Sequence, residues 1–158
     1  MGLRGDAIAQ FDWTVGRVMK ALEEMGLDEN TLVLLTSDNG PVVNDGYEDR
    51  AEELLNGHSP AGPTRVPLIV RWPQGIKGGK DSQTLMSQID FLASFGEMLG
   101  AKLPKGSAFD SQPHFGNLLG DGTNARPYVI EQSLSHVLSV RTPEWKYIEP
   151  SDGGAFMQ

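Results

Sequence analysis

Apolar residues recur at steps of three and four along the first part of the chain, which is the spacing of one face of an α-helix. They are Ile8, Phe11, Val15, Val18 and Leu22. The pattern predicts a helix over about residues 6–25. Asp6 is placed to cap its start, and Gly26 stands where helices commonly end in a left-handed residue.

The hydrophobic pattern then changes from helical spacing to short continuous runs. Residues 32–36 form an unbroken run that predicts a strand covered on both faces. A second apolar strand is predicted at residues 66–72, where Pro73 closes it. Residues 40–65 between them are rich in glycine and proline and predict a long loop, a kind of segment that often carries function.

The second half of the chain predicts one longer helix and then a small sheet. Ser87 and Asp90 resemble a capping box, and apolar residues follow at helical steps until Gly100. We expect a short helix near residues 115–119 and strands at 128–132, 138–141 and 145–148. The predicted fold class is α/β: helix–strand units over residues 1–75, then a small C-terminal antiparallel sheet packed with a helix over residues 76–158.

Composition narrows the classes of function. The 158 residues carry 21 Asp and Glu against 13 Lys and Arg, a net charge of −8, which argues against nucleic acid and anionic membranes as partners. The chain has no cysteine, so disulfides, zinc–thiolate sites and thiol nucleophiles are excluded. No apolar run approaches the ~18 residues of a membrane span, and the first residues as written lack the pattern of a signal peptide.

Asp38 and Asn39 follow the first predicted strand, with only Ser37 between. One interpretation is a β-hairpin, because Asn-Gly favours a tight turn and Val42-Val43 would be the return strand; Pro41 weakens it by removing a ladder donor. The other is a metal site, since carboxylate and amide oxygens beyond a strand end suit calcium or magnesium. Such a cation takes about six oxygens, so its other ligands would come from elsewhere.

Three segments in order carry a family resemblance. They read FDWTVGRV at 11–18, GLDENTLVLLTSDNGP at 26–41 and TRVPLIVRWP at 64–73. Together they resemble the C-terminal half of a type I sulfatase (arylsulfatase) of the alkaline-phosphatase superfamily. The likeness continues through 87–100, 126–132 and 139–147 and so covers almost the whole chain. It implies that residues 1–75 are the C-terminal part of the α/β catalytic domain and residues 76–158 a C-terminal α+β subdomain.

The resemblance also implies a metal role for the residues that end the first strand. In such sulfatases the Asp and Asn of the S-D-N-G motif help to bind one calcium ion, so Asp38 and Asn39 are expected to be metal ligands. The family's other ligands lie in the N-terminal part of the full enzyme, together with the formylglycine nucleophile that is made from Cys or Ser in a C/S-x-P-x-R motif. This sequence contains no such motif. We therefore assign no catalytic residue here and expect residues outside this sequence to complete the site.

The segment before the second strand lines the substrate pocket in relatives. The resemblance therefore implies that His58 contacts a sulfated small molecule or glycan, whereas a solvated loop histidine is the plainer interpretation. Relatives carry a lysine-bearing, glycine-rich stretch where Pro63 here meets Thr64, so we assign no sulfate-binding lysine. His114 is interpreted as a loop residue and His136 as a surface or packing residue.

Three hypotheses about function result. The first is a part of a sulfatase that hydrolyses aryl or carbohydrate sulfates by a calcium-dependent formylglycine mechanism and is inactive alone. The second is a phosphoesterase of the same superfamily, although such relatives tend to have a histidine at the position of Asn39. The third is a non-catalytic truncated module. Under the first hypothesis, the N-terminal half of the enzyme is the partner of this chain. Without that half, the apolar strand at 32–36 predicts self-association. A periplasmic or secreted location is expected for the full-length family member.

Overall fold

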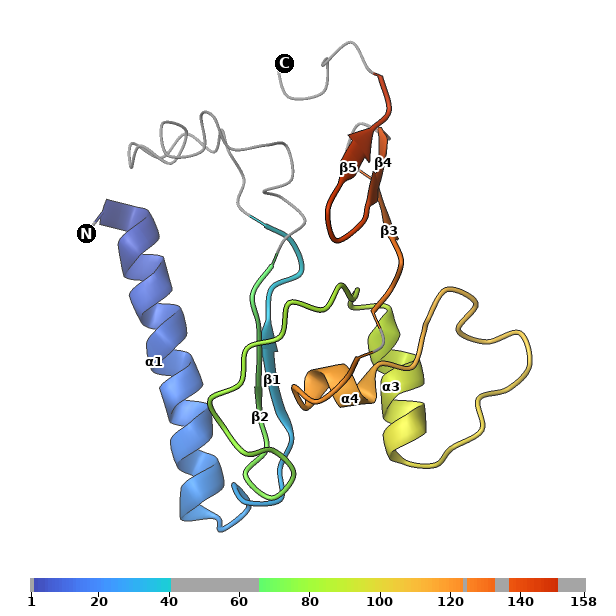
Figure 1. Ribbon diagram of the computed structural model, residues 1–158. Coiled ribbons are helices and arrows are strands. Elements are labelled where there is room, and N and C mark those ends of the chain that lie inside the picture. The colour runs from blue at the N-terminus through green and yellow to red at the C-terminus, as the bar shows by residue number, and fades with distance from the viewer. Residues whose placement is uncertain (1, 41–65, 124, 133–136, 151–158) are drawn as a thin grey trace. The chain divides into compact units, whose positions relative to one another are not determined.

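The computed structural model describes residues 2–40, 66–123, 125–132 and 137–150 (Figure 1). The chain divides into two compact units, residues 1–78 and 79–158, and each is described by itself. Unit 1 contains α1 (Gly2–Glu24), β1 (Val33–Thr36) and β2 (Leu68–Arg71). Unit 2 contains α3 (Asp90–Met98), α4 (Phe115–Leu118), β3 (Val129–Gln132), β4 (Leu138–Arg141) and β5 (Lys146–Ile148). No described helix has the length and apolar character that crossing a membrane requires.

Helix α1 begins a turn earlier than its apolar spacing predicts and ends where the glycine predicts. Gly26 has a φ of +64°, the left-handed conformation that glycine adopts without steric cost. Its N–H donates to the Glu23 carbonyl at 2.9 Å, and the Leu27 N–H donates to the Leu22 carbonyl at 2.9 Å. These two bonds form a Schellman motif, so the predicted helix end is confirmed.

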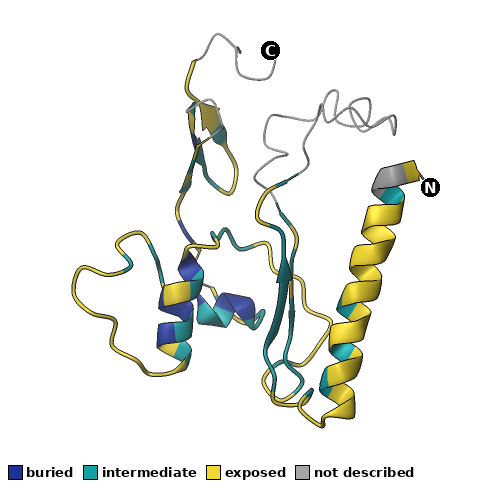
Figure 2. Cartoon of the chain, turned by 180° about the vertical axis from the view of Figure 1, so that it is seen from behind, coloured by how far each residue is buried: buried dark blue, intermediate teal, exposed yellow. Residues whose placement is uncertain are grey.

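The apolar stripe of α1 lies in the open. Figure 2 shows the helix as exposed along nearly its whole length. Ile8, Phe11 and Val18 are 62%, 55% and 53% exposed. Trp13 lies on the opposite side of the helix and is 64% exposed, with the Arg17 guanidinium carbon 5.6 Å from its ring centroid. The described part of unit 1 therefore leaves this stripe uncovered.

Strands β1 and β2 form an antiparallel pair in which Val33 lies opposite Arg71 and Thr36 opposite Leu68. The Arg71 guanidinium donates to the Asp28 carbonyl at 3.2 Å and lies 3.4 Å from the Asp28 carboxylate. This contact links the turn before β1 to the end of β2. The prediction that residues 32–36 are covered on both faces is wrong for this chain, because their side chains are only half-buried. Among the described residues this sheet has two strands, and such a pair cannot cover its own faces.

Strand β2 ends in a tight turn beneath a tryptophan ring. The Gly75 N–H donates to the Trp72 carbonyl at 2.9 Å, and the Ile76 N–H donates to the same carbonyl at 2.7 Å. The Trp72 ring lies so close to Gly75 that a Cβ at this position would overlap its ring carbons. Glycine is therefore required here by close approach of the ring.

Unit 2 combines two packed helices with a three-stranded sheet of order β3-β4-β5, antiparallel throughout. Ile130, Val140 and Tyr147 lie opposite one another across the three strands. The alternate positions carry a Lys146–Glu131 ion pair of 2.6 Å, with side chains 9% and 16% exposed. The α/β fold class with a small C-terminal antiparallel sheet is thus confirmed.

Candidate functional site

The chain turns sharply directly after β1. The Ser37 hydroxyl donates to the Asn39 carbonyl at 2.9 Å, and the Asn39 N–H donates to Oδ1 of Asp38 at 2.9 Å. The Asn39 side-chain amide in turn donates from Nδ2 to the Gly40 carbonyl at 2.8 Å. Local hydrogen bonds of this kind are the reason why Ser, Asp and Asn favour turns. They hold Asp38 and Asn39 side by side at the end of the strand.

These bonds use only one oxygen of the Asp38 carboxylate and only the nitrogen of the Asn39 amide. Within the described residues, Oδ2 of Asp38 and Oδ1 of Asn39 form no hydrogen bond, and both residues are exposed. Two hard oxygen donors suit calcium or magnesium, but such ions take about six. Among the described residues no group of three His, Asp or Glu is placed to hold a metal ion. The described chain therefore supplies a pair of donors rather than a complete site.

Several sequence predictions lie outside the described residues. They are His58, His136, the Pro63-Thr64 junction and the hairpin strand at Val42-Val43. The strand that pairs with β1 among the described residues is β2.

His114 lies in the loop before α4, as interpreted, but it is not an ordinary loop residue. It is buried just before α4, and its main-chain N–H donates to Oγ of Ser94 at 2.9 Å. Its Nδ1 lies 3.3 Å from Nδ2 of Asn117. His114 therefore belongs to the packing between α3 and α4.

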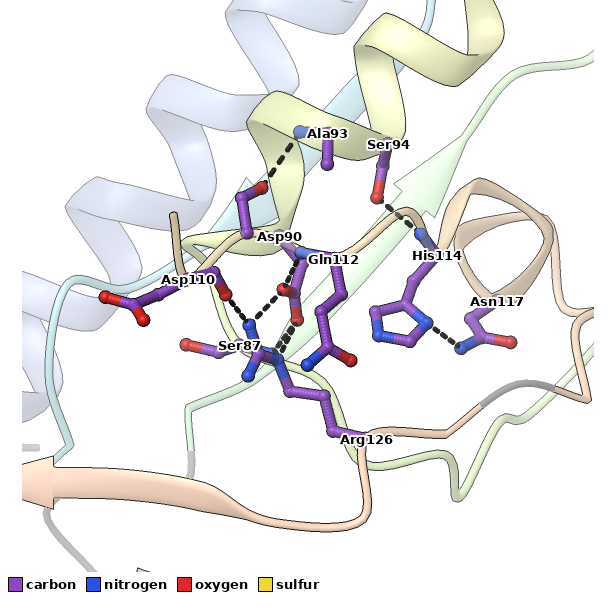
Figure 3. Close-up of polar contacts among 10 residues, drawn as sticks. Ser87, Asp90, Ala93, Ser94, Asp110, Gln112, His114, Asn117 and Arg126 are labelled. Carbon is purple, nitrogen blue, oxygen red and sulfur yellow. Dashed lines mark hydrogen bonds and ion pairs between the residues drawn. The ribbon is translucent and has the colours of Figure 1, made fainter. Parts of the chain in front are cut away.

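A buried ion pair that sequence reasoning missed organises unit 2 (Figure 3). Asp90 is fully buried and Arg126 is 7% exposed. Nε of Arg126 donates to Oδ2 of Asp90 at 2.7 Å, and Nη2 donates to Oδ1 at 2.6 Å. This two-pronged geometry is the strong form of a carboxylate–guanidinium contact. Arg126 also donates to the Asp110 carbonyl, and so the pair joins three segments of the unit.

Main-chain donors complete the surroundings of Asp90. Ser87 and Gln112 each donate an N–H to the carboxylate at 2.9 Å. The capping box predicted at Ser87 is formed only in this first bond, because α3 begins at Asp90 with Ile89 as its N-cap and no side-chain cap bond. Burial raises the pKa of Asp90, but the hydrogen bonds from Arg126, Ser87 and Gln112 outweigh it, so that the pKa lies below its ordinary value of 3.8. The bond to Asp90 likewise raises the pKa of Arg126. Both groups are therefore charged at neutral pH, and the pair is structural.

Nothing in the sequence pattern marks this pair. Asp90 reads as a helix-start acid and Arg126 as a charge at the foot of a strand, 36 positions away. Capping and periodicity describe neighbours within about one turn of chain, whereas this contact depends on how the loop before Arg126 folds back. A charged residue that is buried in the fold has to be paired, but the partner is set by tertiary structure.

Comparison with known proteins decides the family. The sulfatase family model matches residues 1–101, which is more than half of the chain. The chain belongs to the sulfatase family. This sulfatase chain is 46% identical to the N-acetylgalactosamine-6-O-sulfatase of Bacteroides thetaiotaomicron over 98% of its residues, which cover 32% of that relative. It is 32% identical to human arylsulfatase A over 90% of its residues, which cover 29% of that protein.

The sulfatase chain thus spans about a third of the length of these two relatives. The alignment with the Bacteroides relative extends over 167 positions, more than the 158 residues here, so that relative carries residues within the aligned span that this chain lacks.

Solved structures show the same fold. A Bacteroides thetaiotaomicron structure from work on glycosaminoglycan metabolism matches with a TM-score of 0.84 and 45% identity; 98% of this chain covers 34% of that one. A second structure, solved in complex with its substrate D-glucosamine-2-N,6-O-disulfate, matches 89% of the chain with a TM-score of 0.68. At 23% identity the second match shows the fold alone.

Proposed function

We propose that this chain supplies the C-terminal third of an enzyme that hydrolyses sulfate esters, with carbohydrate sulfates as the substrate class, and that Asp38 and Asn39 are two ligands of its calcium ion. The observation that carries this proposal is the pair of oxygens at the end of β1 that the local hydrogen bonds leave available. The substrate class is supported by the 46% identity to an N-acetylgalactosamine-6-O-sulfatase along almost the whole chain. Residues 1–75 would belong to the catalytic domain and residues 76–158 to the C-terminal subdomain.

The local geometry suits the two side chains to this task. The Asn39 N–H holds one oxygen of Asp38, and this leaves the other oxygen to bind a cation. The bond from Nδ2 of Asn39 to the Gly40 carbonyl fixes the amide so that Oδ1 lies on its other side. Ligands that are already oriented lose less conformational entropy when the metal binds. Calcium, when bound, would offset the negative charge of a sulfate ester.

The remaining chemistry is assigned outside this sequence. The other metal ligands and the formylglycine would come from the part of the enzyme that precedes these residues, and His58 would contact the sulfated substrate. We therefore expect the 158-residue chain to hydrolyse no aryl sulfate by itself. Turnover by the purified chain would contradict this assignment.

The test is a chimera in which residues 1–158 replace the matching third of the Bacteroides N-acetylgalactosamine-6-O-sulfatase. Sulfate release from N-acetylgalactosamine 6-sulfate is measured with calcium and with a calcium chelator. Asp38→Ala and Asn39→Ala should each lower the rate by more than the ~10–100-fold typical of outer-shell partners. Asp81→Ala, which removes another exposed carboxylate, is the matched control. A calcium-dependent rate that survives Asp38→Ala would overturn the ligand assignment.

A further inference from the structure

We propose that Asn39 is a site of spontaneous modification. The main-chain nitrogen of Gly40 attacks the side-chain amide of Asn39 and forms a succinimide ring, which opens to aspartate and isoaspartate. The hydroxyl of Ser37 promotes the attack. The modification itself needs no metal ion and is independent of the proposed function, whereas its consequence, the loss of one calcium ligand, rests on that function.

The residue that follows Asn39 leaves the attacking nitrogen open. Asn39 is exposed, and Gly40 has no Cβ that could shield its own nitrogen. Among the described residues the Gly40 N–H donates no hydrogen bond, so its loss breaks no such bond within the described chain. Asn30 is also an exposed asparagine in a turn, but the β-branched Thr31 follows it. Asn30 therefore provides a comparison in which the attacking nitrogen is shielded.

A side-chain hydrogen bond keeps Asn39 folded toward the residue that attacks it. Nδ2 of Asn39 donates to the Gly40 carbonyl at 2.8 Å. The ring that this bond closes contains both Cγ of Asn39 and the main-chain nitrogen of Gly40, which are the two atoms that have to meet. Holding two reacting groups within one small ring lowers the entropic cost of bringing them together.

The Ser37 hydroxyl stabilises the attacking form of the Gly40 nitrogen. Oγ of Ser37 donates to the Asn39 carbonyl at 2.9 Å, and this carbonyl belongs to the same peptide unit as the Gly40 N–H. When the N–H loses its proton, the negative charge is shared with the carbonyl oxygen of that peptide, because the two groups are in resonance. A hydrogen-bond donor that is already aimed at this oxygen stabilises the charge as it develops. The same hydroxyl lies 3.5 Å from Oδ1 of Asp38, which is a longer contact.

The reaction needs no co-reactant except water. A bond forms between the Gly40 nitrogen and Cγ of Asn39, and the bond between Cγ and Nδ2 of Asn39 breaks. The proton from the Gly40 nitrogen leaves with Nδ2 as ammonia. Water then opens the ring: addition at Cγ gives aspartate, and addition at the main-chain carbonyl carbon of residue 39 gives isoaspartate. Either product replaces the neutral amide that the proposed function assigns to calcium.

The experiment follows the purified 158-residue chain during incubation at neutral pH. Peptide mass spectrometry measures the conversion of Asn39 and of Asn30, and the identical dipeptide Asn56-Gly57 serves as the reference for solution conditions. Labelling by an isoaspartyl methyltransferase detects isoaspartate in the Asn39 peptide. The variants are Ser37→Ala, Ser37→Thr, which keeps a hydroxyl, and Gly40→Ala.

We expect Asn39 to convert at least about tenfold faster than Asn30, and Gly40→Ala to remove most of this difference. Ser37→Ala should slow conversion at Asn39 by about fivefold, the factor that one hydrogen bond is worth, and should leave the rate at Asn56 unchanged. Ser37→Thr should keep the original rate. Equal rates at Asn39 and Asn30, a product at Asn39 without isoaspartate, or a rate that does not fall in Ser37→Ala would each overturn the proposal.

Failure of this proposal and failure of the calcium assignment remain distinguishable. The conversion is measured by mass in the chain alone, without calcium and without turnover. The calcium-dependent rate of the freshly prepared chimera tests the two ligands whether or not Asn39 is later modified.

Discussion

Replacing Asp90 with alanine is expected to destabilise unit 2 severely. The carboxylate accepts two hydrogen bonds from Arg126, at 2.6 and 2.7 Å, and one each from the N–H groups of Ser87 and Gln112, at 2.9 Å. Asp90→Ala removes all four acceptor contacts at once. It leaves the guanidinium of Arg126, a residue that is 7% exposed, with the Asp110 carbonyl as its remaining hydrogen-bond partner among the described residues.

The expected loss in the free energy of unfolding follows from these lost contacts. Breaking a buried ion pair by removing one partner costs about 3–5 kcal/mol, because the other charge stays buried. Each main-chain N–H that loses its acceptor adds about 1–3 kcal/mol unless water reaches it. These contributions share one network and are not additive. A loss of about 4 kcal/mol or more is expected, a large part of the ~5–15 kcal/mol that stabilises a domain.

Arg126→Met provides the decisive comparison. If the cost of Asp90→Ala comes from an uncompensated buried charge, then Asp90→Ala with Arg126→Met should be more stable than Asp90→Ala alone. Urea unfolding followed by circular dichroism measures the free energies. Hydrogen exchange at the main-chain N–H of Leu119, which donates to the Phe115 carbonyl and not to Asp90, assigns the change to unit 2. A double variant less stable than Asp90→Ala would refute the reasoning.

The same pair predicts the response to acid. Because the folded pKa of Asp90 lies below 3.8, the carboxylate stabilises the fold fully above its ordinary pKa and loses this contribution as the pH falls through the lowered value. Unfolding measured between pH 5 and about pH 2 should show this loss in the unchanged chain. Asp90→Asn has no carboxylate to titrate at this position, so its stability should not show this loss. If Asp90→Asn and the unchanged chain lost stability identically with falling pH, the prediction would be contradicted.

Two further substitutions test local packing. Gly75→Ala should cost about 1–3 kcal/mol, because its Cβ would overlap the Trp72 ring; Gly16→Ala, where a Cβ meets nothing within 4 Å, should instead stabilise α1 by about 0.5–1 kcal/mol in thermal unfolding. Ser94→Ala should cost about 1–3 kcal/mol, since it removes the acceptor of the buried His114 N–H; unchanged exchange of that amide would show that another acceptor replaces it.

Local signals in the sequence were sufficient to predict most of the helices and strands. Helix α1, its end at Gly26 and the strand β4 depend on spacing and on backbone preference, and both act over a few residues. The same reasoning placed Asp38 and Asn39 just beyond β1, after Ser37, and the structure has them in the turn at that place. Their turn is built from hydrogen bonds between residues one or two positions apart, and the local sequence can specify such bonds.

Burial was the part that local signals could not give. The run at residues 32–36 has the composition of a fully covered strand, but coverage depends on layers that these residues do not contain. Asp90 and Arg126 read as ordinary charges, and they are buried because the segment between them folds back over α3. His114 is buried for the same reason. Such contacts are set by tertiary structure and cannot be predicted from the spacing of apolar residues along the chain.

The way in which α3 holds its neighbouring segment has a consequence for how this region can vary. Asp90, Ser94 and Glu97 accept hydrogen bonds from the main-chain N–H groups of residues 112, 114 and 115, at 2.9, 2.9 and 3.2 Å. Pro113, which has no N–H, stands at the one position of that run from which no donor is needed. Recognition of main chain tolerates many side chains at residues 112 and 115, but it fixes the number of residues. Sequence drift is therefore expected here by substitution, whereas an inserted or deleted residue would shift every donor away from its acceptor.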